Sequence, residues 1–212
     1  MNSQLLRFDE NKTLLFIDVE TENLCLNLKL NRFWEIAYIL VKGKEIIKQQ
    51  QYYVKWDKPI KVGAEAAKVT GFDQKKYDEL SIDQETVFKD VYEKMESADF
   101  IAGHNIIGFD LNFIVQWYQI FGKPWKHLVK KVIDTNSLAR GIKMNIPFKS
   151  GDNLTEYQYK IYHNVVKGVK SRLSLLADEF GIEYDPNRLH SALDDLKLNI
   201  AVWNKIKYKI QI

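Results

Sequence analysis

The length and composition of the chain indicate one globular domain. The chain has 212 residues, 46% of them hydrophobic, and its five Trp, eleven Tyr and eleven Phe supply ample material for a core. No apolar run approaches the ~20 residues of a membrane span, and residues 1–12 lack the basic and apolar stretches of a signal peptide. The single cysteine, Cys25, excludes an internal disulfide framework and fits a reducing compartment. We therefore expect residues 1–212 to form a single cytoplasmic domain with no membrane partner.

The charge balance is slightly basic, with 31 Lys and Arg against 28 Asp and Glu and a formal net charge of +3. If several acids gather in one pocket, the remaining surface is more basic than this total suggests, which would suit a polyanionic substrate. An ordinary charged surface explains the same totals equally well. Charge alone leaves both interpretations open.

Hydrophobic patterns predict a mixed α/β sheet of five strands flanked by helices. Strands are expected at residues 12–18, 33–43, 45–56, 98–105 and 130–135. The first of them carries the unbroken apolar run that is typical of a central strand buried on both faces. Helices are expected at residues 62–70, 84–96, 110–121, 136–140, 171–181 and 191–207. Asp134 and Thr135 are candidates to cap the helix at 136–140.

In residues 141–170, apolar residues do not recur at a regular helical or strand spacing. We expect an insertion, a loop or a partly helical arm there. The segment alternates lysines with aromatic residues: Lys143, Lys149, Lys160, Lys167 and Lys170 with Phe148, Tyr157, Tyr159 and Tyr162. Lysines can contact phosphates and aromatic rings can stack on unpaired bases, a combination that binds single strands. The alternative is that the aromatic rings pack on the domain.

Two carboxylates, Asp18 and Glu20, follow the apolar run of the first strand. Because side chains alternate along a strand, both point to one face, about 6.5–7 Å apart along the backbone. Their repulsion is about 2–3 kcal/mol at an effective dielectric constant near 20. A divalent cation such as Mg²⁺, which binds hard oxygen ligands, would neutralise the pair. The alternative is that the strand ends at Ile17 and that water solvates both acids.

A further acid, Asp110, lies in the first turn of the helix expected after the fourth strand. An acid there can simply be favourable at a helix N-terminus. The position is also the C-terminal edge of a strand, where ligand crevices form in open α/β sheets. Asn105, in the preceding loop, is placed to bind either the backbone or a substrate oxygen.

A histidine, His190, is followed closely by Asp194 and Asp195 at the start of the last helix. A lone histidine is more often structural than catalytic, but a histidine beside acids is a better candidate for proton transfer. Helical spacing from His190 favours Asp194 as its neighbour.

These segments resemble the motifs of the DEDDh-type 3′–5′ exonucleases, the family of bacterial polymerase proofreading subunits, ribonuclease T, oligoribonuclease and three-prime repair exonucleases. "FIDVET" resembles the first motif, an apolar run that ends in Asp-x-Glu-Thr. "HNIIGFDLNFI" resembles the second motif, and "HSALDD" the third, in which an Asp follows the His by five residues. "VTGF" and "IDTNSLAR" are also similar to family segments. The resemblance runs from residue 13 to about 204, apart from most of 141–170, and the order of the motifs makes it specific.

The resemblance implies a ribonuclease-H-like fold and hydrolysis of phosphodiester bonds from a 3′ end, with release of nucleoside 5′-monophosphates. It makes Asp18, Glu20, Asp110 and Asp195 the ligands of two Mg²⁺ or Mn²⁺ ions, so that family spacing selects Asp195 over Asp194. It makes His190 the general base that takes a proton from the attacking water. Nucleic acid with a free 3′ end, in the first place DNA, is the expected substrate. A DNA polymerase is a candidate partner, with proofreading or DNA repair as the process.

The residues expected to position substrate are Thr21, Leu24 and Asn105, with Leu24 as an apolar wedge against the terminal base. The family commonly has Glu-Thr-Thr-Gly where this chain has Glu20, Thr21, Glu22 and Asn23. The nucleotide pocket is therefore expected to differ in shape. Asn23 fits the glycine position if its backbone is left-handed.

Two other functions remain as alternatives. An RNA-directed exoribonuclease would use the same acids, because contacts near the 2′-OH separate RNA from DNA. A catalytically silent module would only bind nucleic acid or a polymerase. Four mutually repelling carboxylates argue against the silent module, since such a module has no reason to keep them.

Overall fold

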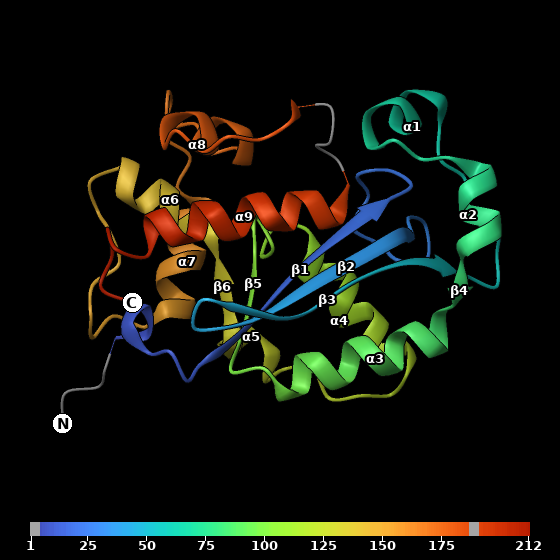
Figure 1. The fold of residues 1–212 in the computed structure, drawn as a ribbon, viewed down its shortest axis with the longest axis horizontal. Helices are drawn as coiled ribbons and strands as arrows, with labels where there is room; N and C mark the ends of the chain where they lie inside the picture. The colour runs from blue at the N-terminus through green and yellow to red at the C-terminus, as the bar shows by residue number, and fades with distance from the viewer. Residues whose placement is uncertain (1–4, 187–190) are drawn as a thin grey trace.

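The computed structural model describes residues 5–186 and 191–212, and these form a mixed six-stranded sheet flanked by helices (Figure 1). The strands are β1 (Thr13–Thr21), β2 (Phe33–Lys42), β3 (Glu45–Lys55), β4 (Ile82–Asp83), β5 (Phe100–Gly103) and β6 (Val132–Asp134). They lie in the order β4-β3-β2-β1-β5-β6. β1 pairs antiparallel with β2 and parallel with β5, so it is central, as its apolar run predicts.

Helices cover both faces of the sheet (Figure 1). They are η1 (Leu6–Phe8), α1 (Ala64–Thr70), α2 (Gln74–Leu80), α3 (Gln84–Ser97), α4 (Asp110–Ile120), α5 (Leu128–Lys131), α6 (Thr135–Lys143), α7 (Leu154–His163), α8 (Leu173–Glu179) and α9 (Ala192–Ile206). As predicted, Asp134 caps α6: its side chain accepts a hydrogen bond from Ser137 N. Within the described ranges, no helix is long and apolar enough to cross a membrane.

The two faces of β1 belong to two different cores. Leu15, Ile17 and Val19 share a core with α3 and α4, whereas Leu14 and Phe16 share the other core with α6, α8 and α9. Asp18 and Glu20 continue the row of Leu14 and Phe16, because side chains alternate along a strand. The two carboxylates therefore point to the face that α9 covers.

The sheet has one strand more than the five expected. β4 contributes only two residue pairs with β3, which is too short for an alternating pattern to show in the sequence. Helix α2 was also not predicted. It has seven residues, of which Tyr77 is buried, so it carries no apolar period, although the cap residue Asp73 accepts a hydrogen bond from Lys76 N.

The segment 141–170 is partly helical and packs on the domain. Gln158 of α7 is buried; its Nε2 donates to Val132 O at 3.0 Å and its Oε1 accepts from Asp134 N at 2.6 Å. These bonds attach α7 to the edge strand β6. The four aromatic side chains named above pack against the two cores, as the alternative interpretation predicted. Their rings are therefore used in packing, while Lys160, Lys167 and Lys170 remain exposed.

Replacing Gln158 by Leu tests this attachment. The variant leaves the Val132 carbonyl and the Asp134 N–H without partners, and each buried unsatisfied group costs about 1–3 kcal/mol. We expect a loss of about 2–5 kcal/mol in the free energy of unfolding, measured by urea denaturation. Lys160→Ala, on the exposed side of the same helix, is the control and should change stability by less than about 0.5 kcal/mol. Equal effects of the two variants would mean that the Gln158 bonds contribute nothing.

Candidate active site

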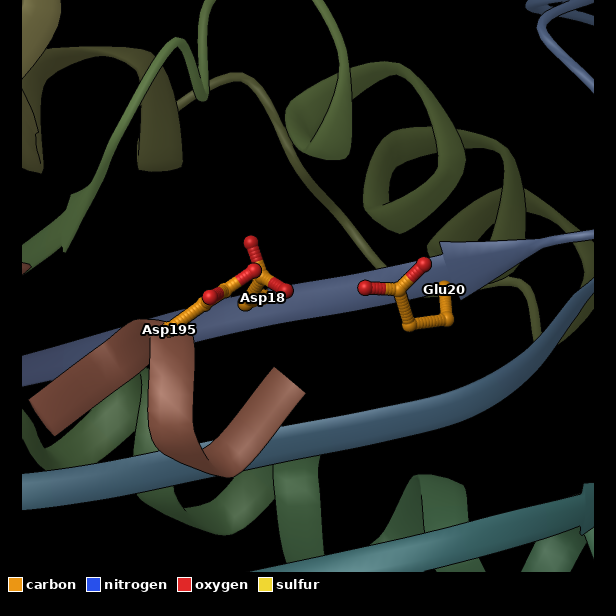
Figure 2. Close-up of side chains that lie close together, drawn as sticks. All are labelled: Asp18, Glu20 and Asp195. Carbon is orange, nitrogen blue, oxygen red and sulfur yellow. The ribbon is translucent and has the colours of Figure 1, made fainter. Parts of the chain in front are cut away.

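Three carboxylates meet where the C-terminal half of β1 passes the first turn of α9 (Figure 2). One oxygen each from Asp18, Glu20 and Asp195 lies within 4.8 Å of the others. All three side chains are half-buried, so each remains open to a ligand from solvent. β1 continues to Thr21, and the alternative in which the strand ends at Ile17 is wrong.

The fourth predicted acid, Asp110, lies beside this cluster and not within it. Asp110 begins α4 and is buried, and its Oδ1 accepts a hydrogen bond from Val19 N at 3.0 Å. This bond holds the start of α4 against β1 between the two acids of the strand. The Asp110 carboxylate is close enough for its charge to raise the pKa of both Asp18 and Glu20.

Burial and mutual repulsion raise the pKa values of these acids. Loss of hydration, followed by the charge of Asp110, raises the pKa of Asp18 well above its ordinary value. Loss of hydration, followed by the charge of Glu35, raises the pKa of Glu20 to about 9. The pKa of Asp110 rises to about 7, again mainly through burial, although the hydrogen bond from Val19 lowers it.

The donor set fits the divalent cations that the family resemblance implies. The cluster offers hard carboxylate oxygens, the ligands that Mg²⁺ and Mn²⁺ prefer. Burial and the neighbouring carboxylates raise the pKa values of Asp18 and Glu20, so a nearby positive charge would favour the ionised forms of both acids. A bound cation would supply that charge and displace the protons.

The structure separates the two candidate acids of α9. Asp195 joins Asp18 and Glu20, whereas Asp194 forms an ion pair with Lys197, with 2.9 Å between Oδ1 and Nζ. Family spacing, and not helical spacing from His190, therefore selects the acid that enters the cluster. His190 lies outside the described residues, and its role as general base stays a prediction.

The three residues expected to position substrate have different environments. Thr21 is buried, and its hydroxyl donates to Asn23 O at 2.6 Å, so it organises the loop after β1. Leu24, on that loop, is 86% exposed and available to an apolar contact. Asn105 has a left-handed backbone (φ 66°), and its N–H donates to Asp134 Oδ1 at 3.2 Å.

A cavity of about 680 Å³ connects Asn105 with Asp195. Its lining includes the polar residues His104, Asn136, Lys170, Ser171 and Arg172. The side chains of Lys170 and Arg172 are exposed, so two cations border the cavity. The volume is within the range of small-molecule sites and suits a nucleotide.

The unusual acid of the first motif, Glu22, has a structural role. Glu22 is buried; its Oε2 accepts from Arg32 N at 2.8 Å and Arg32 Nε at 3.1 Å, and its Oε1 accepts from Lys61 N at 2.5 Å. These bonds close the loop between β1 and β2. Asn23 does not take the left-handed backbone under which it would fit the glycine position: among the described non-glycine residues, only Asn105 and Asn145 have positive φ. Asn23 is held instead by a hydrogen bond from its N–H to Asn31 Oδ1.

Sequence reasoning missed two buried acids beside the site. Asp134, predicted only as a helix cap, also accepts hydrogen bonds from Asn105 N and Ile107 N, both at 3.2 Å. Glu35 is 2% exposed and pairs across the sheet with Glu20. The signal for Glu35 was a single acid in the otherwise apolar run "FWEIAYILV".

A family model described as Exonuclease (RNase_T) matches residues 15–203. The chain belongs to the exonuclease family. The predicted resemblance to DEDDh-type enzymes is confirmed at this level, and the search of curated proteins gave no match.

The fold of this exonuclease family member is similar to that of solved exonuclease I structures. One is the zinc-bound complex of Escherichia coli exonuclease I with single-stranded DNA, with a TM-score of 0.71 and 19% identity over 94% of this chain and 41% of that one. A product-bound exonuclease I has a TM-score of 0.71 and 20% identity, over 93% of this chain and 44% of that one. Exonuclease I of Methylocaldum szegediense has a TM-score of 0.68 and 19% identity, over 93% and 41%. The chain spans about two fifths of the length of these proteins, and the likeness confirms the ribonuclease-H-like fold.

The raised pKa values predict that the metal-free protein loses stability as pH rises. Glu20 holds its proton up to a pKa of about 9 in the folded state, against 4.5 ordinarily, so between these values the unfolded state binds fewer protons. The free energy of unfolding should therefore fall from about pH 5 to about pH 9 in EDTA. Mg²⁺ should reverse the loss, because the cation replaces the protons. Thermal unfolding across this range, with and without Mg²⁺, measures both effects.

Glu20→Gln is the control for this pH dependence, since the amide has no proton to lose. Its profile in EDTA should be flatter than that of the wild-type protein. A wild-type stability that rises over the same range, or a Glu20→Gln profile with an unchanged slope, would contradict the description of the cluster.

Proposed function

We propose that the chain is a metal-dependent 3′–5′ exonuclease domain, formed by residues 1–212, that hydrolyses DNA and releases nucleoside 5′-monophosphates. The observation that carries the proposal is the convergence of Asp18, Glu20 and Asp195, with Asp110 beside them, in a member of the exonuclease family. A structural role alone does not explain three acids that repel one another at a site open to solvent.

In this proposal, the four carboxylates hold two Mg²⁺ or Mn²⁺ ions. When bound, such ions activate a water and neutralise charge at the scissile phosphate. β1 fixes Asp18 and Glu20 on one face, and α9 brings Asp195 over them. The Val19 N–H donates to Asp110 and holds its carboxylate beside β1, next to the two acids of the strand. His190, two residues before Ala192 in the sequence, takes the proton from the attacking water as general base.

The cavity between Asn105 and Asp195 is the proposed site of the terminal nucleotide. Lys170 and Arg172 at its border would meet phosphates, and the exposed Leu24 would contact the terminal base. DNA is favoured over RNA by the likeness to exonuclease I, one of whose structures holds single-stranded DNA. A polymerase partner and a role in proofreading or repair stay predictions.

Two adjacent acids of α9 provide the test. Asp195→Asn removes a proposed metal ligand and should lower turnover by more than about 100-fold, since even outer-shell changes can cost that much. Asp194→Asn is the matched control; it removes the same charge one residue away and should stay within about threefold of wild type. The assay is degradation of 5′-labelled single-stranded DNA, duplex DNA and RNA, with Mg²⁺, Mn²⁺ or EDTA.

The proposal requires cleavage from the 3′ end that EDTA abolishes and that added cation restores. Activity that survives exhaustive chelation would overturn the metal-dependent mechanism. Equal activity of the two Asp→Asn variants would remove Asp195 from it. Cleavage of RNA alone would replace the DNA substrate by RNA.

A further inference from the structure

Glu35 is a buried acid that the mechanism above does not use. It lies in β2 directly opposite Glu20 of β1, and it is 2% exposed. The pKa of Glu35 is raised to about 7, mainly by burial. The charge of Glu35 adds to the repulsion among the neighbouring carboxylates and raises the pKa of Glu20. This cost raises the question of which contacts the Glu35 side chain makes.

The hydrogen bonds of Glu35 join three elements. Its Oε1 accepts from Gln51 Nε2 of β3 at 2.8 Å and from the backbone N–H of Ala192 in α9 at 3.0 Å. The first N–H groups of a helix have no partner within the helix. The cap residue of α9, Ser191, makes no side-chain capping bond. Glu35 therefore caps α9 from a neighbouring strand, with its Oε1 as the acceptor.

This bond connects the strands to the helix that supplies the third acid. Asp195 lies three residues after Ala192, and its N–H donates to Ser191 O at 2.9 Å, so both residues belong to one turn. Glu35 is fixed in turn by its backbone pairing with Glu20. Glu35 thus links Glu20, through the pairing of β1 with β2, to the first turn of α9, which carries Asp195.

We propose that Glu35 is a positioning residue of the metal centre. By accepting the Ala192 N–H, it fixes the first turn of α9 against β1 and sets the place of Asp195 relative to Asp18 and Glu20. The inference rests on the proposed function in one respect, that the cluster binds divalent cations. Glu35 itself is not a metal ligand in this proposal. Its side chain is long enough to place an acceptor oxygen at the Ala192 N–H, and that bond is its contribution.

Three substitutions of Glu35 distinguish the effect of its acceptor oxygen and side-chain length from the effect of its charge. Glu35→Ala removes the acceptor and should weaken Mn²⁺ binding at least tenfold, and lower kcat with little change in KM for an oligonucleotide. Glu35→Gln keeps an oxygen at the same reach and should stay within about threefold of wild type in both measurements. Glu35→Asp keeps the charge but shortens the side chain, and should lie closer to Glu35→Ala. Mn²⁺ binding is measured by the electron paramagnetic resonance signal of free Mn²⁺, without nucleic acid.

Asp90 provides a matched control on the other face of the sheet. Its carboxylate accepts hydrogen bonds from Tyr38 Oη, Tyr52 Oη and Lys48 Nζ, so Asp90→Ala also removes a bonded acid from the sheet–helix interface. We expect Asp90→Ala to lower the melting temperature while Mn²⁺ affinity and kcat remain unchanged. This control shows whether a general loss of stability is enough to disturb the site.

The outcomes distinguish this inference from the proposed function. Wild-type Mn²⁺ affinity in Glu35→Ala, or an equal loss in Asp90→Ala, would overturn the positioning role and leave the exonuclease proposal intact. Normal behaviour of Glu35→Asp with a loss in Glu35→Gln would also overturn it, since charge would then matter and reach would not. A wild-type protein that neither binds Mn²⁺ nor cleaves would overturn both. If Glu35→Ala does not fold, the Gln and Asp variants decide.

Discussion

Repulsion between the carboxylates at the end of β1 is the constraint on which the rest of the site depends. Asp18 and Glu20 face the same way, and α9 brings Asp195 to them where water is partly excluded. Such an arrangement persists only if the surrounding structure holds it in place. Hydrogen bonds from backbone N–H groups do this: Val19 donates to Asp110, and Ala192 donates to Glu35. The fold stabilises the site by fixing its edges and leaves the charge at its centre for a ligand to balance.

Strand β1 performs two tasks because its side chains alternate. On one face, Ile17 and Val19 complete the core beneath α3 and α4. On the other, the row that begins with apolar Leu14 ends in the two acids beneath α9. A shift of one residue in the pairing of β1 would exchange the two faces and bury the acids in a core. The deep burial of Leu15, Ile17 and Val19 thus fixes which face of β1 carries the two acids.

Hydrophobic patterns and motif spacing in the sequence predicted the central strand and the acids of the site. Features that depend on contacts between residues far apart in the chain could not be predicted in this way. The apolar run before Asp18 predicted a central strand, and the motif spacing predicted which acid of α9 enters the cluster. The strand β4 has only two residues, too few for an alternating hydrophobic pattern to appear in the sequence. The partner of Glu35 could not be inferred, since Ala192 is 157 residues away in the chain. In the sequence, Glu22 looks like a further acid of the motif that contains Asp18 and Glu20. The fold shows that it instead forms an ion pair with Arg32.

Asp134 shows how a buried acid can support the acidic cluster without belonging to it. Its carboxylate is fully buried and accepts N–H groups from the first turn of α6 and from the loop that carries Asn105. Loss of this side chain would loosen two segments at once. A library of random variants scored only by nuclease activity would therefore rank Asp134 with the proposed cation ligands. Separating the two classes requires a second score, the amount of folded protein, in which Asp134 variants would be depleted and those of Asp18 would not.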